Sequence, residues 1–251
     1  MKRFILFAAL STACAWSIGI PRVGYTRDAQ GLVRAVDGIA GNFLVGDPID
    51  ARAALAFAWN GNFGIRKTDA SIEWLDSTGG LAGSIDAPAG GAVLGFDRAG
   101  GSAWVFFEES QTLYTVSTIQ SIIHLSEVPL SLATNEEVMA LAGNLDSVDI
   151  ALRRGDGIYV ATFDRSSGSR LGEVALTRSA SRVLLLTDGS IAGIDGSTLW
   201  LLRLDGSDWS IDTGVGLLSL SPMASNWIQA GPFALRTGAE PRLYQIPEAV
   251  Q

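Results

Sequence analysis

The only histidine and the only cysteine of this 251-residue chain are His124 and Cys14. A disulfide needs two cysteines, and a zinc site built on Cys and His clusters needs several such ligands, so the composition excludes both. A nucleophilic triad would depend on His124 alone, and no Gly-x-Ser-x-Gly element supplies a nucleophile. Alternation along the segment Ser-Ile-Ile-His-Leu-Ser-Glu predicts that His124 is a half-exposed residue of an outer strand. We therefore predict no catalytic residue.

Aspartate and asparagine side chains recur after the apolar segments of the chain. They are Asn60, Asn62, Asp97, Asn144, Asp146, Asp188 and Asn226. Oxygen ligands of this kind could hold a hard cation such as calcium, but the Asp-x-Asp-x-Asp-Gly spacing of a calcium loop is absent. Asp and Asn also favour tight turns, and this interpretation predicts no metal and no cofactor. A meeting of Asp97, Asp146 and Asp188 in space would overturn it.

The elements that carry these residues are short strands. Apolar runs such as Trp-Val-Phe-Phe at 104–107 and Val-Leu-Leu-Leu at 183–186 are separated by Gly-Gly or Asp-Gly turn signals every 8 to 12 residues. Hardly any helical periodicity occurs after residue 16. This pattern predicts an all-β fold, namely a sandwich, a barrel or a propeller.

A repeat near 43 residues distinguishes among these folds. An aliphatic residue, often followed by an aromatic one, recurs after a turn at Leu32, Ile72, Leu113, Ile158, Leu199 and Leu243. The spacings are 40, 41, 45, 41 and 44 residues, the length of a four-stranded propeller blade. A sandwich does not predict this regularity, and solenoid turns are shorter. The sequence therefore predicts a β-propeller of four-stranded antiparallel blades, with six blades indicated and five or seven left open.

A second series of apolar segments predicts the innermost strand of each blade. These segments are 54–57, 93–96, 138–141, 183–186 and 217–220. The anchor residues would then lie on the third strand from the centre. The first repeat lacks an obvious innermost strand, and the last lacks a fourth strand after Leu243. We predict that residues 18–25 complete the last blade and so close the ring.

The segment Tyr159-Val-Ala-Thr-Phe-Asp164-Arg-Ser-Ser-Gly168 resembles the strand and Asp-x-x-x-Gly turn of the broad superfamily of secreted bacterial β-propeller repeat proteins. The resemblance covers most of the chain and implies a fold but no particular activity. It also implies that ligands bind on the face that carries the turns between second and third strands and the connections between blades.

Charged residues at that face are the predicted binding rim. They are Arg66, Lys67, Glu108, Glu109, Arg153, Arg154, Arg236 and Arg242. They would select a polar or ionic ligand, or else they are simply solvent-exposed charges at turns, with no ligand. The longest predicted connection, 127–137, contains Pro129, and long loops in compact β folds are often functional. Trp59 and Trp227 would stack on a sugar if they were exposed at a channel mouth.

The N-terminus has the order of a secretory signal peptide. Lys2 and Arg3 precede an apolar run at 4–10, and Ala13-Cys14-Ala15 is a small-residue cleavage site. We predict a signal peptide over residues 1–15, a single domain over 16–251, and export to the periplasm or the extracellular space. Lipidation of Cys14 is the alternative. No stretch reaches the roughly 20 apolar residues of a membrane span.

The charge balance, and a sequence without a recognisable catalytic or metal-binding motif, lead to two functional hypotheses. A net charge of −8 argues against a nucleic-acid partner. The first hypothesis is an exported, monomeric, non-catalytic binding or scaffold module with a protein or glycan partner. The alternative is a propeller hydrolase or lyase acting on a lactone or saccharide, with carboxylates and a divalent ion in the channel.

Overall fold

The computed structural model describes residues 20–119 and 122–247 of the chain. This part contains 23 β-strands and no helix, so no helix in it is long and apolar enough to cross a membrane. The predicted signal peptide and Cys14 lie outside the described residues. The prediction of an all-β chain of four-stranded antiparallel units is confirmed, with one unit of three strands.

We number the units sheet 1 to sheet 6 in chain order. Sheet 1 contains β1 (Arg22–Arg27), β2 (Val33–Ile39) and β3 (Asn42–Pro48). Sheet 2 contains β4 (Ala56–Trp59), β5 (Gly64–Lys67), β6 (Ser71–Leu75) and β7 (Leu81–Asp86). Sheet 3 contains β8 (Ala92–Asp97), β9 (Ala103–Phe107), β10 (Thr112–Ile119) and β11 (Ile122–Val128).

Sheet 4 contains β12 (Glu137–Gly143), β13 (Ser147–Arg154), β14 (Gly157–Asp164) and β15 (Arg170–Ala175). Sheet 5 contains β16 (Arg182–Leu185), β17 (Ile191–Asp195), β18 (Thr198–Leu202) and β19 (Asp208–Asp212). Sheet 6 contains β20 (Leu220–Ala224), β21 (Trp227–Ala230), β22 (Phe233–Arg236) and β23 (Arg242–Gln245). A short parallel pairing of Ala142 and Gly143 with Phe96 and Asp97 joins sheets 3 and 4.

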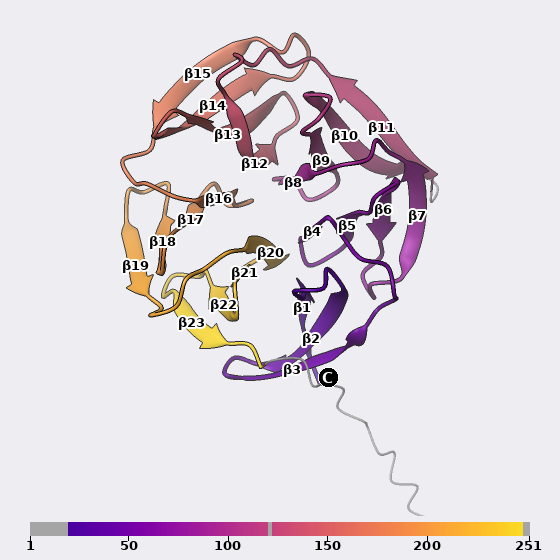
Figure 1. Cartoon of the computed structure of the whole chain (residues 1–251), viewed down its shortest axis with the longest axis vertical. Coiled ribbons are helices and arrows are strands. Elements are labelled where there is room, and N and C mark those ends of the chain that lie inside the picture. Colours follow the sequence, from indigo (N-terminus) through magenta and orange to yellow (C-terminus); the bar gives the residue numbers. More distant parts are fainter. Residues whose placement is uncertain (1–19, 120–121, 248–251) are drawn as a thin grey trace, which may run out of the picture.

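The sheets are arranged around a common centre, with the first strand of each four-stranded sheet innermost (Figure 1). Within each sheet consecutive strands are joined by hairpins, including Asp-Gly turns in which Gly189 and Gly206 have φ angles of 84° and 80°. Positive φ at these positions favours glycine. The innermost strands begin on the side that also carries the connections between sheets and the turns between second and third strands. We call this side the loop face.

Sheet 1 lacks an innermost strand, as predicted. The turn after β1 lies beside the start of β4, because Ala54 N–H donates to the Gly31 carbonyl at 2.8 Å and Arg27 donates to the Leu55 carbonyl at 2.6 Å. β1 therefore runs toward the loop face, which is the orientation of the second strand in each four-stranded sheet. Because sheet 1 contributes no innermost strand, β20 of sheet 6 contacts β4 of sheet 2 directly. The five innermost strands therefore surround the centre; they are β4, β8, β12, β16 and β20.

Two details of the predicted closure are wrong. Residues 22–25 belong to β1, which pairs with β2, whereas sheet 6 has four strands of its own. Leu243 lies on β23, the fourth strand, and not on a third strand. The third strand β22 reads Phe-Ala-Leu-Arg and lacks the aliphatic-aromatic order, which the Arg-Leu-Tyr-Gln of β23 carries instead.

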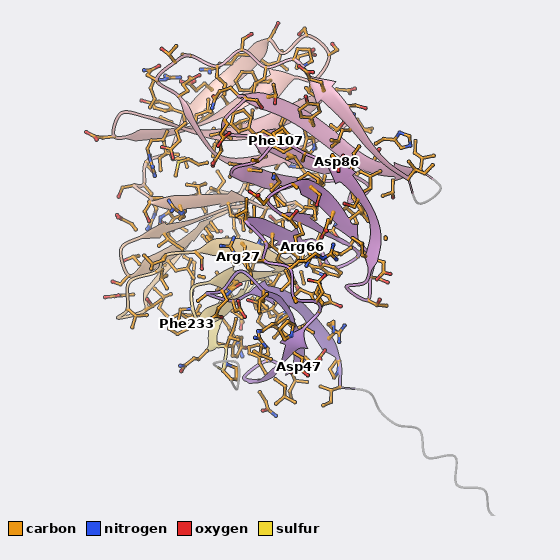
Figure 2. The ribbon with its side chains drawn as sticks, turned by 45° about the vertical axis from the view of Figure 1, so that its right-hand side comes forward. Arg27, Asp47, Arg66, Asp86, Phe107 and Phe233 are labelled. Carbon is orange, nitrogen blue, oxygen red and sulfur yellow. The ribbon has the colours of Figure 1, made fainter. Side chains whose placement is uncertain are left out.

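Aromatic side chains pack between neighbouring sheets. Figure 2 shows the side chains on the ribbon, with Phe107 of sheet 3 and Phe233 of sheet 6 labelled. Phe63 and Trp74 of sheet 2 stack with ring centroids 3.9 Å apart, and Phe96 of sheet 3 meets Phe63 edge-on at 5.4 Å. Large buried rings of this kind contribute much of the apolar area that a core removes from water. The packing between sheets therefore holds each sheet, and the turns at its ends, in position.

Candidate binding site on the loop face

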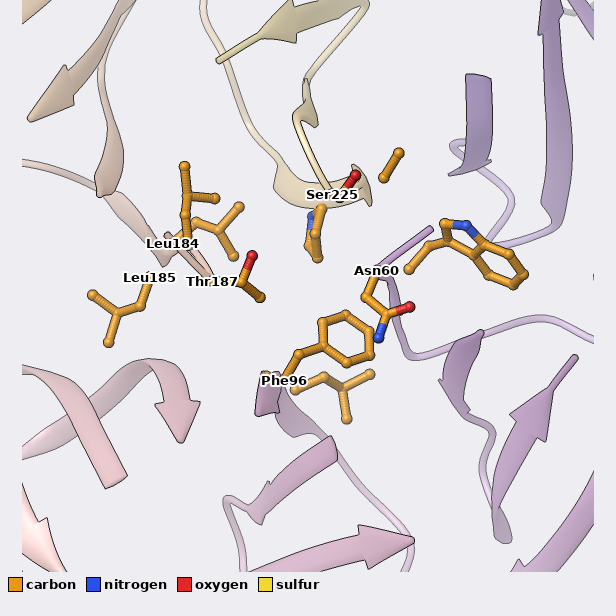
Figure 3. A pocket seen from close by; sticks show the side chains of 12 residues that line it. Asn60, Phe96, Leu184, Leu185, Thr187 and Ser225 are labelled. Carbon is orange, nitrogen blue, oxygen red and sulfur yellow. The ribbon is translucent and has the colours of Figure 1, made fainter. Parts of the chain in front are cut away.

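A small cavity lies at the centre of the ring, at the ends of the innermost strands. It has a volume of about 30 Å³ and is lined from four sheets by residues that include Asn60, Phe96, Thr187 and Ser225 (Figure 3). This volume accommodates about two water molecules and no saccharide. The side-chain nitrogen of Asn60 is buried without a hydrogen-bond partner, so a water molecule is its natural complement.

The acidic residues that follow innermost strands serve separate turns. Asp97 accepts hydrogen bonds from Ala99 N–H at 2.7 Å and from Ser102 Oγ at 3.2 Å. Asp188 accepts one from Ser190 N–H at 2.9 Å. Among the described residues, no group of three His, Cys, Asp or Glu side chains is placed to hold a metal ion. The arrangement lends no support to channel carboxylates acting on a bound cation.

A larger cavity of about 600 Å³ opens on the loop face. It lies between the connection of β11 to β12 and the turn between β9 and β10. It is lined by Gln111, Leu130, Ser131, Leu132, Ala133, Thr134 and Glu136. We call it the loop-face pocket. Residues 129–136, within the loop predicted as functional, form the longest connection between sheets in the described part of the chain.

Glu136 holds this loop in place. Its side chain is 1% exposed, and its carboxylate accepts hydrogen bonds from Arg154 at 2.5 Å, from Arg170 at 2.7 Å and from Ala133 N–H at 2.9 Å. Burial by itself would raise the pKa of Glu136, but the guanidinium groups of Arg170 and Arg154 outweigh it and lower that pKa to about 2. The loop is thus fastened to sheet 4 by a charged carboxylate at neutral pH.

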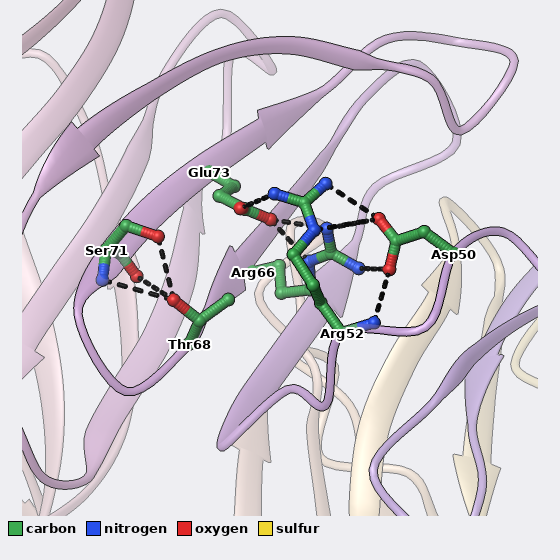
Figure 4. A network of polar contacts seen from close by, with 6 residues as sticks. All are labelled: Asp50, Arg52, Arg66, Thr68, Ser71 and Glu73. Carbon is green, nitrogen blue, oxygen red and sulfur yellow. Dashed lines mark hydrogen bonds and ion pairs between the residues drawn. The ribbon is translucent and has the colours of Figure 1, made fainter.

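Arg66 and Lys67 are not part of an exposed rim, contrary to prediction. Arg66 is 0% exposed and donates to Glu73 at 2.6 Å and to both oxygens of Asp50 at 2.9 and 2.8 Å (Figure 4). Arg52 bridges the same two acids. The Nζ of Lys67 donates to the Asp69 carbonyl at 3.2 Å, and burial lowers its pKa. Arg66 secures the connection between sheets 1 and 2, and Lys67 secures the turn between β5 and β6.

The other rim candidates divide between two places. Glu108 and Glu109 are exposed in the turn between β9 and β10, against Gly91 and Gly90 of the connection before β8. In the same turn, Gln111 Nε2 donates to the Glu108 carbonyl at 2.6 Å. Arg154 binds Glu136, and Arg153 pairs with Glu137 at 3.1 Å. Arg236 and Arg242, by contrast, flank the turn between β22 and β23 and are therefore misplaced by the prediction. The error follows from assigning Leu243 to a third strand.

Two further predictions concern single side chains. His124 is exposed on the outer strand β11, opposite Ser117 of β10, as predicted. Trp59 is 2% exposed and lies against Tyr25 with centroids 4.2 Å apart, so it is not accessible to a sugar. Trp227 is half-buried against Phe43. These tryptophans belong to the packing between sheets.

Sequence reasoning missed Gln111, Glu136, Arg170 and Glu173. Arg170 follows Glu136 by 34 residues, and Arg154 also pairs with Glu173, at 2.8 Å. No local spacing encodes such pairs, because they form when a loop packs on a sheet further along the chain. The one available signal was the acidic end of the long loop.

The comparisons with known proteins indicate a fold and no family. No protein-family model and no curated protein matches the chain. One similar solved structure is PorZ, an essential bacterial surface component of the type-IX secretion system of Porphyromonas gingivalis. It has 13% sequence identity and a TM-score of 0.50 over 92% of this chain, which spans only 39% of the PorZ chain. Another is a protein of unknown function from Bacteroides caccae, with 11% identity and a TM-score of 0.53 over 88% of this chain and 85% of that one. Both are propeller-like, and the likeness at this identity concerns the fold alone.

Proposed function

We propose that the protein is a non-catalytic binding or scaffold module whose partner, a protein or a glycan, docks at the loop-face pocket. The observation that carries the proposal is a cavity of about 600 Å³ whose main wall is fastened by the buried Glu136. A loop that is already ordered loses little conformational freedom when a partner binds, so more of the contact energy appears as affinity.

The hydrolase or lyase alternative has less support. Its carboxylates would have to converge on the channel, but Asp97 and Asp188 each accept hydrogen bonds within their own turns. The central cavity of about 30 Å³ has no room for a lactone or a sugar ring. The loop-face pocket has one lining carboxylate, Glu136, and that group is engaged by two arginines.

The fold that we propose for this function is a six-bladed β-propeller whose first blade lacks its innermost strand. The arrangement of the sheets around one centre and the contact of β20 with β4 support it. We further propose that the protein acts as a monomer. Sedimentation equilibrium of the purified protein tests this point, and a dimer mass would contradict it.

We also propose that the protein acts outside the cytoplasm. The support is the ordered n-region, apolar run and cleavage site of residues 1–15. Mass spectrometry of the exported protein is expected to give a chain beginning at Trp16. A chain that retains Met1 would contradict export through this signal, and a diacylglycerol on Cys14 would establish the lipoprotein alternative.

A pair of matched variants tests the binding function. Ser131→Trp places a large side chain in the loop-face pocket, and Ser219→Trp places it on an exposed connection between sheets 5 and 6. Wild type and both variants are applied to a peptide array and a glycan array. Ligands retained by wild type and Ser219→Trp but lost by Ser131→Trp support the proposal. Equal binding by all three excludes the pocket, and no binding by wild type contradicts a binding module for either partner class.

A further inference from the structure

We infer that the side of the ring opposite the loop face rests on the surface of a phospholipid membrane. We call this side the far face. It carries the turns between first and second strands and the turns between third and fourth strands. The inference adds a second binding surface and does not depend on the loop-face pocket. Three features carry it: exposed aliphatic side chains, arginines without an acidic partner, and the point at which the chain enters β1.

The first feature is exposed aliphatic side chains at the turns between third and fourth strands. Each of sheets 1 to 5 has at least one in or next to this turn, where β2 and β3 of sheet 1 count as third and fourth strands. These residues are Ile39, Leu81, Ile119, Ile122, Leu171 and Leu204. None of the exposed large apolar residues of the described part lies in a turn between second and third strands, on the loop face. The two faces therefore offer different chemistry to a partner.

Some of these side chains are direct neighbours. The carbonyl of Pro21 accepts a hydrogen bond at 2.8 Å from the N–H of the residue before Ile39, so the exposed Ile20 lies next to the end of β2. In sheet 3, Ile119 and Ile122 are cross-strand partners, and both are exposed. Adjacent aliphatic side chains can enter the headgroup boundary of a bilayer together, and the apolar area that they bury there drives membrane binding.

The second feature is arginine side chains beside exposed leucines. Arg165 donates to the carbonyl of Leu145 at 3.3 Å, and Leu145 is exposed in the turn between β12 and β13. Arg203 directly precedes Leu204 and donates to the Ala239 carbonyl at 3.1 Å. Neither arginine forms a salt bridge within the described residues. A guanidinium group can bind the phosphate of a lipid headgroup while the neighbouring leucine contacts the acyl region.

The third feature is the point at which the chain enters the fold. β1 runs toward the loop face, so its start, which follows Ile20, is at the far face. In the sequence, Trp16 and Ile18 follow the predicted cleavage site, and tryptophan is enriched at membrane–water interfaces. If Cys14 is lipidated instead, Arg22 follows the anchor by eight positions, a reach of at most about 28 Å. Both alternatives therefore join an apolar group to the far face.

The charge of the chain decides which lipid it favours. The net charge of −8 disfavours a membrane surface of the same sign, so we expect a zwitterionic lipid such as phosphatidylcholine. The turns between second and third strands carry the exposed acids Asp69, Glu108, Glu109 and Asp156. Desolvating such carboxylates at a lipid surface would cost free energy. The far face is therefore the side that approaches the membrane, and the loop-face pocket stays open to the solvent.

The test is flotation of the exported protein with phosphatidylcholine vesicles. All proteins carry Cys14→Ser, so that no lipid is attached to the chain. The far-face variant is Ile39→Ser/Ile119→Ser/Ile122→Ser. The matched control, Leu55→Ser/Val215→Ser/Leu218→Ser, removes three exposed aliphatic side chains from connections on the loop face. We expect the parent protein to bind, with affinity falling about tenfold in the far-face variant and less than about twofold in the control.

A second variant tests the phosphate contacts independently of the aliphatic residues. Arg165→Gln/Arg203→Gln keeps the aliphatic side chains and removes both guanidinium groups. We expect it to lower the affinity for phosphatidylcholine vesicles about threefold. An unchanged affinity would contradict the role of the arginines. This variant remains informative if the triple far-face variant does not fold, which circular dichroism checks.

Several outcomes would overturn the inference. No vesicle binding by the parent protein overturns it, and so do equal losses in the far-face variant and the loop-face control. Tighter binding to phosphatidylglycerol vesicles than to phosphatidylcholine vesicles contradicts the charge argument. A dimer mass that the far-face variant abolishes, without vesicle binding, would make a second copy of the chain the occupant. The array experiment on the loop-face pocket is independent of all these results.

Discussion

Trp104 of sheet 3 lies directly against Gly143 of sheet 4. A Cβ atom on Gly143 would fall 1.8 Å from the indole Nε1 of Trp104, so only a glycine fits between the two sheets. Gly143 also takes part in the short parallel pairing with Asp97 that joins these sheets. A glycine at position 143 is therefore required for the packing of sheet 3 against sheet 4, the two sheets whose loops line the loop-face pocket.

Gly143→Ala is expected to destabilise the protein by about 3 kcal/mol, the upper end of the usual range for overpacking. The reason is steric, because the methyl group meets a fully buried ring. Urea denaturation measures the change. The control is Gly172→Ala on β15, where a Cβ would have no atom within 4 Å. Equal stability of the two variants would contradict the assigned packing.

Arg66→Ala is expected to cost about 3–5 kcal/mol of unfolding free energy, since it removes the buried partner of Glu73 and leaves that buried carboxylate with Arg52 alone. Glu73, the partner, is 2% exposed. The control, Arg242→Ala, removes an exposed pair with Glu240 and is expected to cost about 0–1 kcal/mol. Chemical denaturation of both variants at neutral pH decides the point, and a loss below about 1 kcal/mol for Arg66→Ala would argue against the buried network.

Glu136 makes stability depend on acid pH. Its pKa is lowered from 4.5 to about 2 in the folded protein. A lowered carboxyl pKa contributes stability that is fully present above the unfolded value and is lost as pH falls through the folded value. Melting temperatures of wild type and Glu136→Gln, measured from pH 6 to pH 2, are expected to differ most above pH 4.5 and to converge toward pH 2. A constant difference would contradict this role of Glu136.

Asp97 is expected to act as a turn residue and not as a calcium ligand. Asp97→Ala removes the acceptor for Ala99 N–H and is expected to cost about 1 kcal/mol. Asp97→Asn keeps a side-chain oxygen and is expected to cost less. Added calcium is expected to leave the melting temperature of wild type unchanged. A rise on calcium addition that Asp97→Asn abolishes would revive the enzymatic alternative.

The amino-acid sequence by itself determined the local architecture. Strand alternation, Asp-Gly turns and the spacing of Ile72, Leu113, Ile158 and Leu199 predicted four-stranded antiparallel units, and these residues do lie on third strands. The absence of an apolar strand before β1 likewise predicted the missing innermost strand of sheet 1. These features depend on residues close in the chain, whose backbone preferences act before any packing is formed.

Only the tertiary structure decided which charged residues face solvent and where the pocket lies. Arg66 is buried because Asp50 and Glu73 converge on it, and Glu136 is buried because Arg170 reaches it from 34 residues away. A charge can leave water only when such partners are in place, and partners from separate strands and connections carry no sequence period. Exposure, ion pairing and the shape of the loop-face pocket therefore arise from how the sheets pack, which residue spacing does not encode.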